Sequence, residues 1–172
     1  YRLRRPRGVD RDRGGEIQIA RSRDGIEFET IWQATKDQLI STSIERCALR
    51  RREDGSWILY VSYVDPADGR WRIELVKADQ PYQFDLSSLN PVLSAADIEA
   101  EAVKDPFLFS IGSQWGMIAS YAYASADASS DQLHGTFDAY NTGLIRSATG
   151  LALSDDGYNW QWQGQVLSLI HI

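Results

Sequence analysis

One pattern occurs three times in the chain, in Leu151-Ala-Leu-Ser-Asp-Asp-Gly-Tyr-Asn-Trp160, in Leu75-Val-Lys-Ala-Asp-Gln-Pro-Tyr-Gln-Phe84 and in Ile19-Ala-Arg-Ser-Arg-Asp-Gly-Ile-Glu-Phe28. Each copy joins an apolar segment of strand type to a polar turn and then to an aromatic residue. The aromatics stand at positions 28, 84 and 160, so they are 56 and 76 residues apart. The longer interval contains the polar stretch 125–140, and without that stretch the two intervals become similar. The chain therefore consists of repeated units.

Strand signals dominate within these units. Aromatic and β-branched residues, which favour strands, are concentrated in segments 57–64, 71–77, 107–111 and 115–121. In segment 57–64 both alternating sets of residues are apolar, which predicts a strand with protein on both faces. Helical signal is confined to 95–102, which is too short for a crossover between parallel strands.

The turns between the strands are of the hairpin type. Asp-Gly supplies the positive φ that a tight turn between antiparallel strands requires. Such dipeptides stand at 24–25, 54–55, 68–69 and 156–157, and Gly112-Ser113 adds a fifth turn. Antiparallel hairpins in units of roughly 50 residues indicate propeller blades of about four strands each.

The repeats place the end of one blade at 16–35, a complete blade at 44–93 and another at 103–167. We therefore predict an all-β fold, a partial β-propeller of about two and a half to three four-stranded antiparallel blades in a single domain. A β-sandwich whose turns happen to share this spacing is the alternative. Three blades would not close a ring, which is consistent with a fragment.

The bulk composition is that of a globular protein. The chain has 172 residues, of which 43% are hydrophobic and 24% charged, enough for one core. Its net charge of −6 provides no chain-wide positive field for nucleic acid or an anionic membrane. No apolar run approaches the roughly 18–20 residues of a spanning helix. We expect a soluble protein that binds neither nucleic acid nor a membrane. The compartment and the oligomeric state stay open.

The ends of the chain also suggest a fragment. It begins with Tyr1 rather than Met, and its last residues, Leu167-Ser-Leu-Ile-His-Ile172, resemble translated adapter sequence. We expect 168–172 to be an artefactual tail, and the lack of a leader says little about secretion.

The chain lacks the residues that several kinds of catalytic, metal and nucleotide-binding site require. Cys47 is the sole cysteine, which excludes an internal disulfide and disfavours a cysteine-based zinc site. Two histidines cannot build a His-rich zinc centre, and they make a Ser-His-Asp triad unconvincing. No Gly-rich phosphate-binding loop is present, so nucleotide binding is not expected.

Acidic residues stand where two inner strands would begin. The innermost strand of a propeller blade runs along the central channel, so polar groups at its start are placed to meet a ligand. Glu45 precedes the first strand of the 44–93 unit, and Asp105 holds the corresponding place in the next unit. Each is followed by a short strand, a turn and an aromatic strand.

These motifs resemble those of a known group of enzymes. Val103-Lys-Asp-Pro-Phe-Leu-Phe109 is similar to the Asp-Pro inner-strand motif of the five-bladed propeller glycosidases, which include glycoside hydrolase family 43 and its relatives in families 32, 62 and 130. Ile44-Glu-Arg-Cys-Ala-Leu49 is similar to their Glu-containing motif, and Ser-x-Asp-Gly-x-x-Phe closes a blade. The resemblance covers about 16–167 and implies a five-bladed type of propeller. The chain departs from the pattern at Arg46-Cys47 and at Phe107, which leaves substrate and mechanism open.

Two carboxylates suit glycosidic cleavage. One acid protonates the leaving oxygen, and a second carboxylate activates water or attacks directly, at a separation of roughly 6.5 to 9.5 Å in inverting enzymes. We predict that Glu45 is the general acid and that Asp105 is the base or modulates the pKa of the donor. Glu101 is a third catalytic candidate, since a nearby acid can raise the pKa of a proton donor.

Four residues are candidates for substrate binding: Arg46, Lys104, Trp115 and His134. Trp115 could stack on a sugar ring, although packing between blades is the simpler interpretation. His134 stands in the polar stretch 125–140, where a channel-facing loop could set specificity or the imidazole could simply be solvated.

The first few residues form a basic segment. Arg2, Arg4, Arg5 and Arg7 could bind a sugar carboxylate, or they could belong to an exposed strand.

The sequence therefore predicts a glycoside hydrolase acting on a carbohydrate substrate. A glycoside phosphorylase of the same fold, or a propeller that binds glycans or proteins without catalysis, are the alternatives. No metal ligand set and no required cofactor are predicted, although the family resemblance implies that a calcium ion could occupy the channel.

Overall fold

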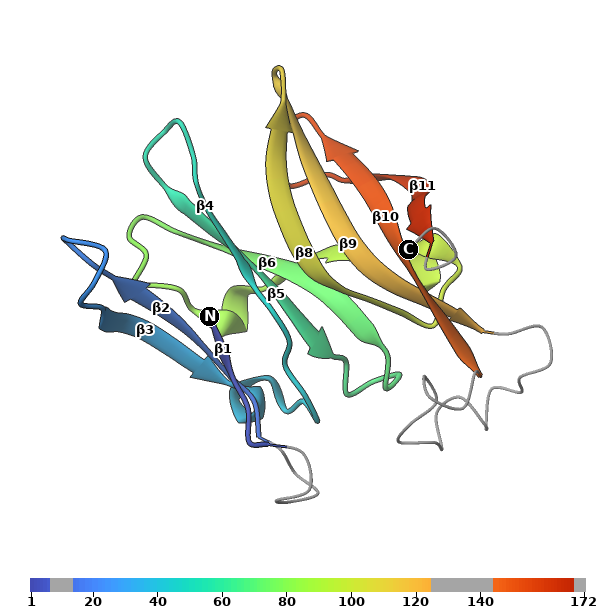
Figure 1. The fold of residues 1–172 in the computed structure, drawn as a ribbon, viewed down its shortest axis with the longest axis horizontal. Helices are drawn as coiled ribbons and strands as arrows, with labels where there is room; N and C mark the ends of the chain where they lie inside the picture. Colours follow the sequence, from blue (N-terminus) through green and yellow to red (C-terminus); the bar gives the residue numbers. More distant parts are fainter. Residues whose placement is uncertain (7–13, 125–143, 169–172) are drawn as a thin grey trace.

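The computed structural model describes residues 1–6, 14–124 and 144–168, and these form an all-β structure (Figure 1). The strands are β1 (Arg2–Leu3), β2 (Glu16–Arg21), β3 (Glu29–Thr35), β4 (Ala48–Arg51), β5 (Trp57–Val64), β6 (Trp71–Ala78), β7 (Asn90–Leu93), β8 (Ala102–Ile111), β9 (Gln114–Ala124), β10 (Ile145–Ser154) and β11 (Gln161–Ser168). The helices within these ranges are the 3-10 turns η1 (Lys36–Leu39), η2 (Leu86–Ser88) and η3 (Ala96–Ile98). None of them has the length and apolar character needed to cross a membrane.

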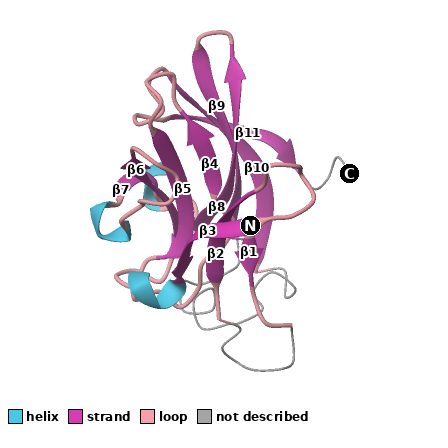
Figure 2. Cartoon of the chain, turned by 90° about the vertical axis from the view of Figure 1, so that its left-hand side faces the viewer, coloured by secondary structure: helices cyan, strands magenta, loops and turns pink. Residues whose placement is uncertain are grey.

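The strands form three groups that follow one another along the chain. β1, β2 and β3 make a separate three-stranded sheet, and the other eight strands share one sheet in the order β11-β10-β9-β8-β6-β5-β4, with β7 paired to β6. Pairing within each group is antiparallel, and a single parallel pair, Trp71 with Ala102, joins β6 to β8. Figure 1 shows β1–β3, β4–β7 and β8–β11 side by side, and Figure 2 shows the same strands from the side.

The predicted strands and turns are confirmed. β5 has the predicted bounds, and β6 is one residue longer than predicted. β8 and β9 contain the predicted segments, but β8 begins five residues earlier, so that Asp105 lies within it. The glycines of all four Asp-Gly turns have positive φ, between 71° and 86°. The helical signal at 95–102 produced only η3.

Two hydrophobic cores lie between the three groups of strands, and β5 contributes to both. Leu59, Val61 and Tyr63 pack toward β2 and β3, while Ile58 and Tyr60 pack toward β8–β11. This confirms the prediction that β5 has protein on both faces. Burying one large apolar side chain contributes about 1.5 to 3 kcal/mol, so this strand is a main source of stability.

The first repeat ends in a hydrogen-bonded turn. Ser22 Oγ accepts the N–H of Gly25 at 2.8 Å, and Asp24 Oδ1 accepts the N–H groups of Ile26 and Glu27 at 2.9 and 3.0 Å. These bonds, led by the one from Ile26, lower the pKa of Asp24 to about 2.

The third repeat ends in a turn with the same hydrogen bonds. Ser154 Oγ accepts the N–H of Gly157 at 2.9 Å, and Asp156 Oδ1 accepts the N–H groups of Tyr158 and Asn159 at 2.7 and 2.8 Å. The bond from Asn159 is the main reason why the pKa of Asp156 lies well below its usual range. The first and third copies of the sequence repeat therefore share one turn structure.

The last two repeats dock on the preceding group of strands. Tyr60 Oη donates to the carbonyl of Gly157, and the rings of Tyr60 and Trp160 meet edge to face at 5.9 Å. Trp32 Nε1 likewise donates to the carbonyl of Phe84 at 3.0 Å, and these two rings meet at 5.7 Å. In the first repeat, by contrast, Phe28 is 65% exposed.

Asp156→Asn should make the stability of the folded protein less dependent on pH. A carboxyl with a lowered pKa in the folded state stabilises the protein above its unfolded pKa of about 3.9, and this contribution is lost as the pH falls below that value. We expect the melting temperature of the variant to fall by a few degrees at pH 7, corresponding to about 1 kcal/mol once the exposure of the turn is considered. Between pH 5 and pH 2 the wild type should lose more stability than the variant.

Asp155→Asn removes the same charge from the neighbouring exposed residue and is the matched control. Melting temperatures measured by circular dichroism across this pH range would contradict the assignment if both variants followed the wild-type curve.

Candidate functional site

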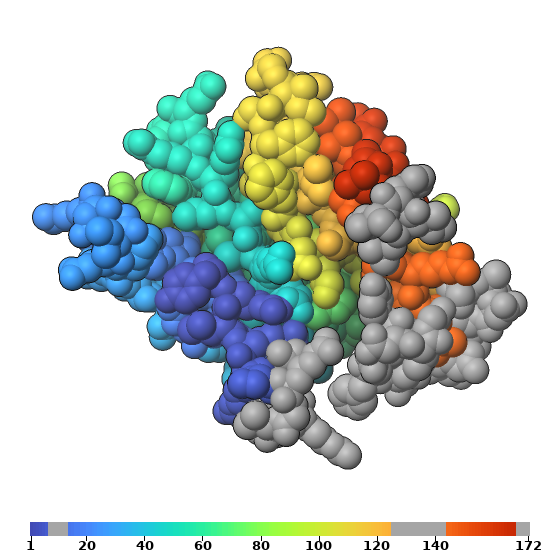
Figure 3. All heavy atoms as spheres, viewed as in Figure 1, coloured from blue at the N-terminus to red at the C-terminus, as the bar shows by residue number. Residues whose placement is uncertain are grey.

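Three segments far apart in the sequence meet at one place. They are the start of the chain with β1, the segment before β4, and the first half of β8. Arg4 Nη1 lies 2.8 Å from Glu45 Oε1, and the backbone N–H of Arg46 donates to Asp105 Oδ1 at 3.3 Å. We call Arg2, Arg4, Glu45, Arg46, Lys104 and Asp105 the charged cluster. In the space-filling view, the surfaces of these three parts of the chain adjoin near the centre of one face (Figure 3).

Glu45 is at the centre of the charged cluster. It is 8% exposed, and its carboxylate forms an ion pair with Arg2, one with Arg4 and a longer one with Lys104, whose Nζ lies 3.8 Å from Oε1. Arg4 also donates from Nη2 to Ser43 Oγ at 2.8 Å, which fixes both ends of its guanidinium. Three cations around one carboxylate favour its ionised form.

Asp105 stands in an irregular part of β8. The pairing of β8 with β9 shifts register between Lys104 and Phe107, and Asp105 has a φ of 55°, in the left-handed region. For a residue with a Cβ this conformation costs roughly 1 to 2 kcal/mol. A bulge of this kind turns a side chain out of its regular alternation. The chain thus accepts backbone strain at the residue predicted to be catalytic.

Ser62 of β5 joins the two acidic residues. Its carbonyl accepts the N–H of Glu45 at 2.8 Å, and its Oγ accepts the N–H of Asp105 at 3.0 Å. Ser62 is fully buried, so these bonds are shielded from water. Ser62 is not among the residues predicted from the sequence, although it is the one hydroxyl-bearing aliphatic residue in the apolar run 57–64.

Lys104 is held between a carboxylate and an aromatic ring. Its Nζ lies 4.9 Å from the ring centroid of Trp71, a cation–π distance. Burial lowers the pKa of Lys104, and the positive charges of Arg2, Arg4 and Arg46 lower it further, while Asp105 acts in the opposite direction. Lys104 therefore lies in a crowded positive environment.

The remaining predicted residues have other contacts or lie outside the described ranges. Glu101 pairs with Arg70, whose Nη2 is 3.5 Å from Glu101 Oε2. Trp115 is at the opposite end of the β8–β9 hairpin from Asp105, where Arg50 lies 5.6 Å from its ring centroid. Arg46 contributes its backbone N–H, and its side chain is exposed. His134 lies outside the described residues.

An exposed aromatic surface follows Asp105. Phe107 is 65% exposed and stacks on Phe109, with ring centroids 6.5 Å apart and an angle of 24° between the rings. The ring of Phe109 covers Gly116, where a Cβ would meet it at 2.4 Å. Gly116 thus allows Phe109 to lie flat on the sheet.

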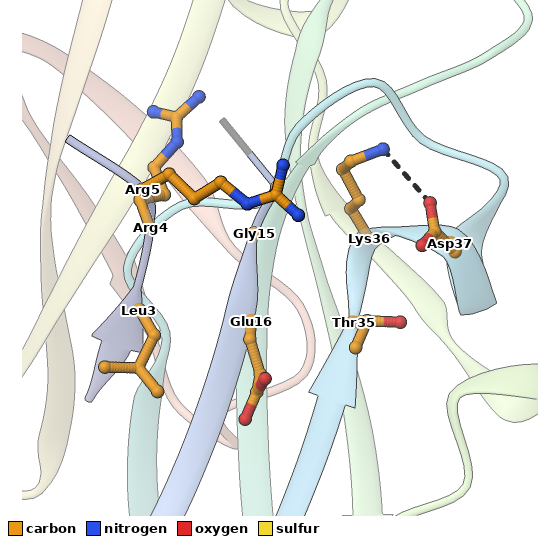
Figure 4. Close-up of a pocket in the computed structure, with 9 residues that line it drawn as sticks. Leu3, Arg4, Arg5, Gly15, Glu16, Thr35, Lys36 and Asp37 are labelled. Atoms are coloured by element: carbon orange, nitrogen blue, oxygen red, sulfur yellow. Dashed lines mark hydrogen bonds and ion pairs between the residues drawn. The ribbon is translucent and has the colours of Figure 1, made fainter. Parts of the chain in front are cut away.

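An open pocket of about 410 Å³ shares Arg4 with the charged cluster. Its walls come from the end of β1 and the residues after it, from the start of β2, from the end of β3 and from the start of η1, where Lys36 pairs with Asp37 at 3.0 Å (Figure 4). Figure 4 shows the side chains of Arg4 and Arg5 diverging, one of them lying across β2 near Gly15. This pocket is lined by cations and acids together and does not include Glu45 or Asp105.

A second buried group of charges lies on β5 and β6 and includes none of the predicted residues. Arg72 pairs with Asp65 and with Glu74, the latter at 3.3 Å, and both acids are 7% exposed. Burial, reinforced by Glu74, raises the pKa of Tyr63. Because each acid shares the same guanidinium, we interpret this group as a structural ion-pair network.

No set of three or more His, Cys, Asp or Glu side chains in the described ranges is arranged to hold a metal ion. The two carboxylates of the charged cluster contact cations and a backbone N–H group. The calcium ion that the family resemblance implied stays a prediction, and no chemical step is assigned to such an ion.

Two replacements of Asp105 should separate the effect of its backbone conformation on stability from the effect of its charge. Asp105→Gly and Asp105→Ala both remove the carboxylate, but glycine adopts a φ of 55° without the steric cost of a Cβ. We expect the glycine variant to exceed the alanine variant by about 1 kcal/mol in the free energy of unfolding, measured by urea denaturation.

The same pair of substitutions at Arg51, in the extended strand β4, is the control and should give the reverse order. A higher stability for Asp105→Ala than for Asp105→Gly would show that the left-handed conformation carries no strain.

Comparison with solved structures identifies similar folds. The GH32 beta-fructofuranosidase BmSUC1 of Bombyx mori aligns with a TM-score of 0.56 at 11% identity, over 91% of this chain and 34% of that protein. A protein provisionally described as a glycoside hydrolase from Bacteroides ovatus aligns with a TM-score of 0.47 at 14% identity, over 94% of this chain and 40% of its own. BT0996, in a complex with RGII, aligns with a TM-score of 0.49 at 13% identity, over 74% and 34%.

The chain thus spans 34 to 40% of the length of these structures. No protein-family model matches the chain, and no curated protein matches it. The expected resemblance to propeller proteins of the glycoside hydrolase type is confirmed at the level of the fold.

Proposed function

We propose that this chain forms part of a glycoside hydrolase in which Glu45 and Asp105 are two of the catalytic carboxylates. The observation that carries the proposal is their convergence on Ser62, although they are 60 residues apart in the sequence. Cleavage through an oxocarbenium-like transition state uses such a pair of carboxylates. The fold shared with the GH32 beta-fructofuranosidase of Bombyx mori supports the same class of reaction.

The contacts of Glu45 refine its proposed role. Three cations favour its ionised form, whereas the general acid predicted from the sequence must carry a proton. We therefore assign Glu45 the role of the carboxylate that activates water or stabilises positive charge at the anomeric carbon. The carboxylate of Asp105 accepts the N–H of Arg46 and has no cation at hydrogen-bonding distance in the described residues, so Asp105 is assigned to proton transfer or to orienting the substrate.

The exposed ring of Phe107 supports a sugar-binding surface beside these acids. Sugar rings present C–H groups that pack on aromatic faces, and Phe107 is the most exposed aromatic residue in β8. It replaces Trp115 as the proposed aromatic contact, because Trp115 packs at the other end of the hairpin.

Asp105→Asn and Glu45→Gln should each lower the rate of cleavage of an activated aryl glycoside by about 100- to 10,000-fold, because each removes one catalytic carboxylate while keeping the side-chain shape. The rate is measured from release of the aryl group by the full-length protein. Glu53→Gln, an exposed acid in the turn after β4, is the control and should retain wild-type activity.

Near-unchanged rates in both variants would reject the catalytic assignment. Retained sugar binding without any cleavage by the wild type would instead favour a binding propeller.

A further inference from the structure

We propose that the charged cluster binds a sugar that carries a carboxylate, with this group contacting Arg2, Arg4 and Lys104. The inference rests on the proposed function, since it names the substrate class of the same site.

The balance of charges in the cluster carries the proposal. In the described residues, three cations, Arg2, Arg4 and Lys104, pair with the single carboxylate of Glu45. The chain as a whole has a net charge of −6, so this local excess of positive charge runs against the general balance. A positive site on a negatively charged protein attracts an anionic ligand to one place rather than to the surface at large.

The cations are held in place before any ligand arrives. Arg4 is fixed between Glu45 and Ser43, at 2.8 Å in both cases, and Lys104 lies over the ring of Trp71. The side chains of Arg2, Arg4 and Lys104 are 25%, 19% and 34% exposed, so solvent reaches them without surrounding them. Partly buried charges are screened less by salt than surface charges, and preorganised ones lose less entropy on binding.

A carboxylate fits this arrangement because Arg2, Arg4 and Lys104 already bind the carboxylate of Glu45. Arginine presents planar, paired donors that match the two oxygens of a carboxylate. The substrate's carboxylate would add a second anion to the group of cations that now surrounds Glu45. Arg2, Arg4 and Arg46 repel the charge of Lys104, and an additional anion would relieve this repulsion.

Binding of methyl galacturonide and methyl glucuronide, each compared with its neutral methyl glycoside by isothermal titration calorimetry, tests the proposal. We expect at least one uronide to bind roughly 10- to 100-fold more tightly than its neutral counterpart. Lys104→Met and Arg4→Gln should remove most of this difference. Arg51→Gln removes one positive charge from the exposed end of β4 and should keep the difference.

Circular dichroism verifies that each variant is folded. Because Arg4→Gln also removes a partner of Glu45, Arg4→Lys and Lys104→Arg serve as second variants that keep the charge, and they should retain part or all of the preference for the uronide. Lys104→Arg should also keep that preference at alkaline pH, where the wild type loses it as Lys104 is deprotonated.

The outcomes separate the proposal from its rivals. Equal binding of uronide and neutral sugar, no binding of either, or a preference that survives Lys104→Met and Arg4→Gln together, would overturn it. Inorganic phosphate is titrated in parallel, and cleavage of a neutral glycoside only in its presence would show that the cluster serves phosphate instead. Cleavage of neutral glycosides by hydrolysis alone would retain the proposed function and reject this inference. A preference for the uronide without any cleavage would support this inference and reject the proposed function.

Discussion

The arrangement of the site depends on Ser62, a polar residue in the middle of a strand that is buried on both faces. Its hydroxyl and its carbonyl accept the backbone N–H groups of Asp105 and Glu45, which come from two different groups of strands. Buried N–H groups require partners, and an unsatisfied one costs about 1 to 3 kcal/mol. β5 therefore contributes both to the cores that hold the sheets together and to the position of the acids.

The charged cluster adds two local costs to this stable framework. Asp105 occupies a left-handed conformation, which is energetically unfavourable for a non-glycine residue. Several cations also lie close enough to repel one another. Such features persist where the surrounding packing determines them, and they are common at functional sites. The double burial of β5 and the docking of the repeated turns provide that packing.

The repeated turns also explain why the groups of strands lie in a definite order. In two of the three repeats the turn presents a carbonyl to a donor on the preceding group, Tyr60 or Trp32, and an aromatic ring packs beside it. The interface between groups thus combines apolar burial with one directional hydrogen bond. Apolar burial stabilises the contact, and the hydrogen bond fixes its register.

The sequence alone determined the all-β class, the bounds of β5 and the Asp-Gly turns, because the alternation of side chains and the positive φ of a turn are local properties. It also predicted Glu45 and Asp105 as catalytic candidates. Only the tertiary structure decided that Asp105 lies in a bulge, that Ser62 links it to Glu45, and that Arg2 and Arg4 join them while Trp115 lies at the other end of the β8–β9 hairpin. Those contacts join residues 17 to 59 positions apart. They follow from the register between strands and from the packing of one sheet on another, which no local pattern of residues specifies.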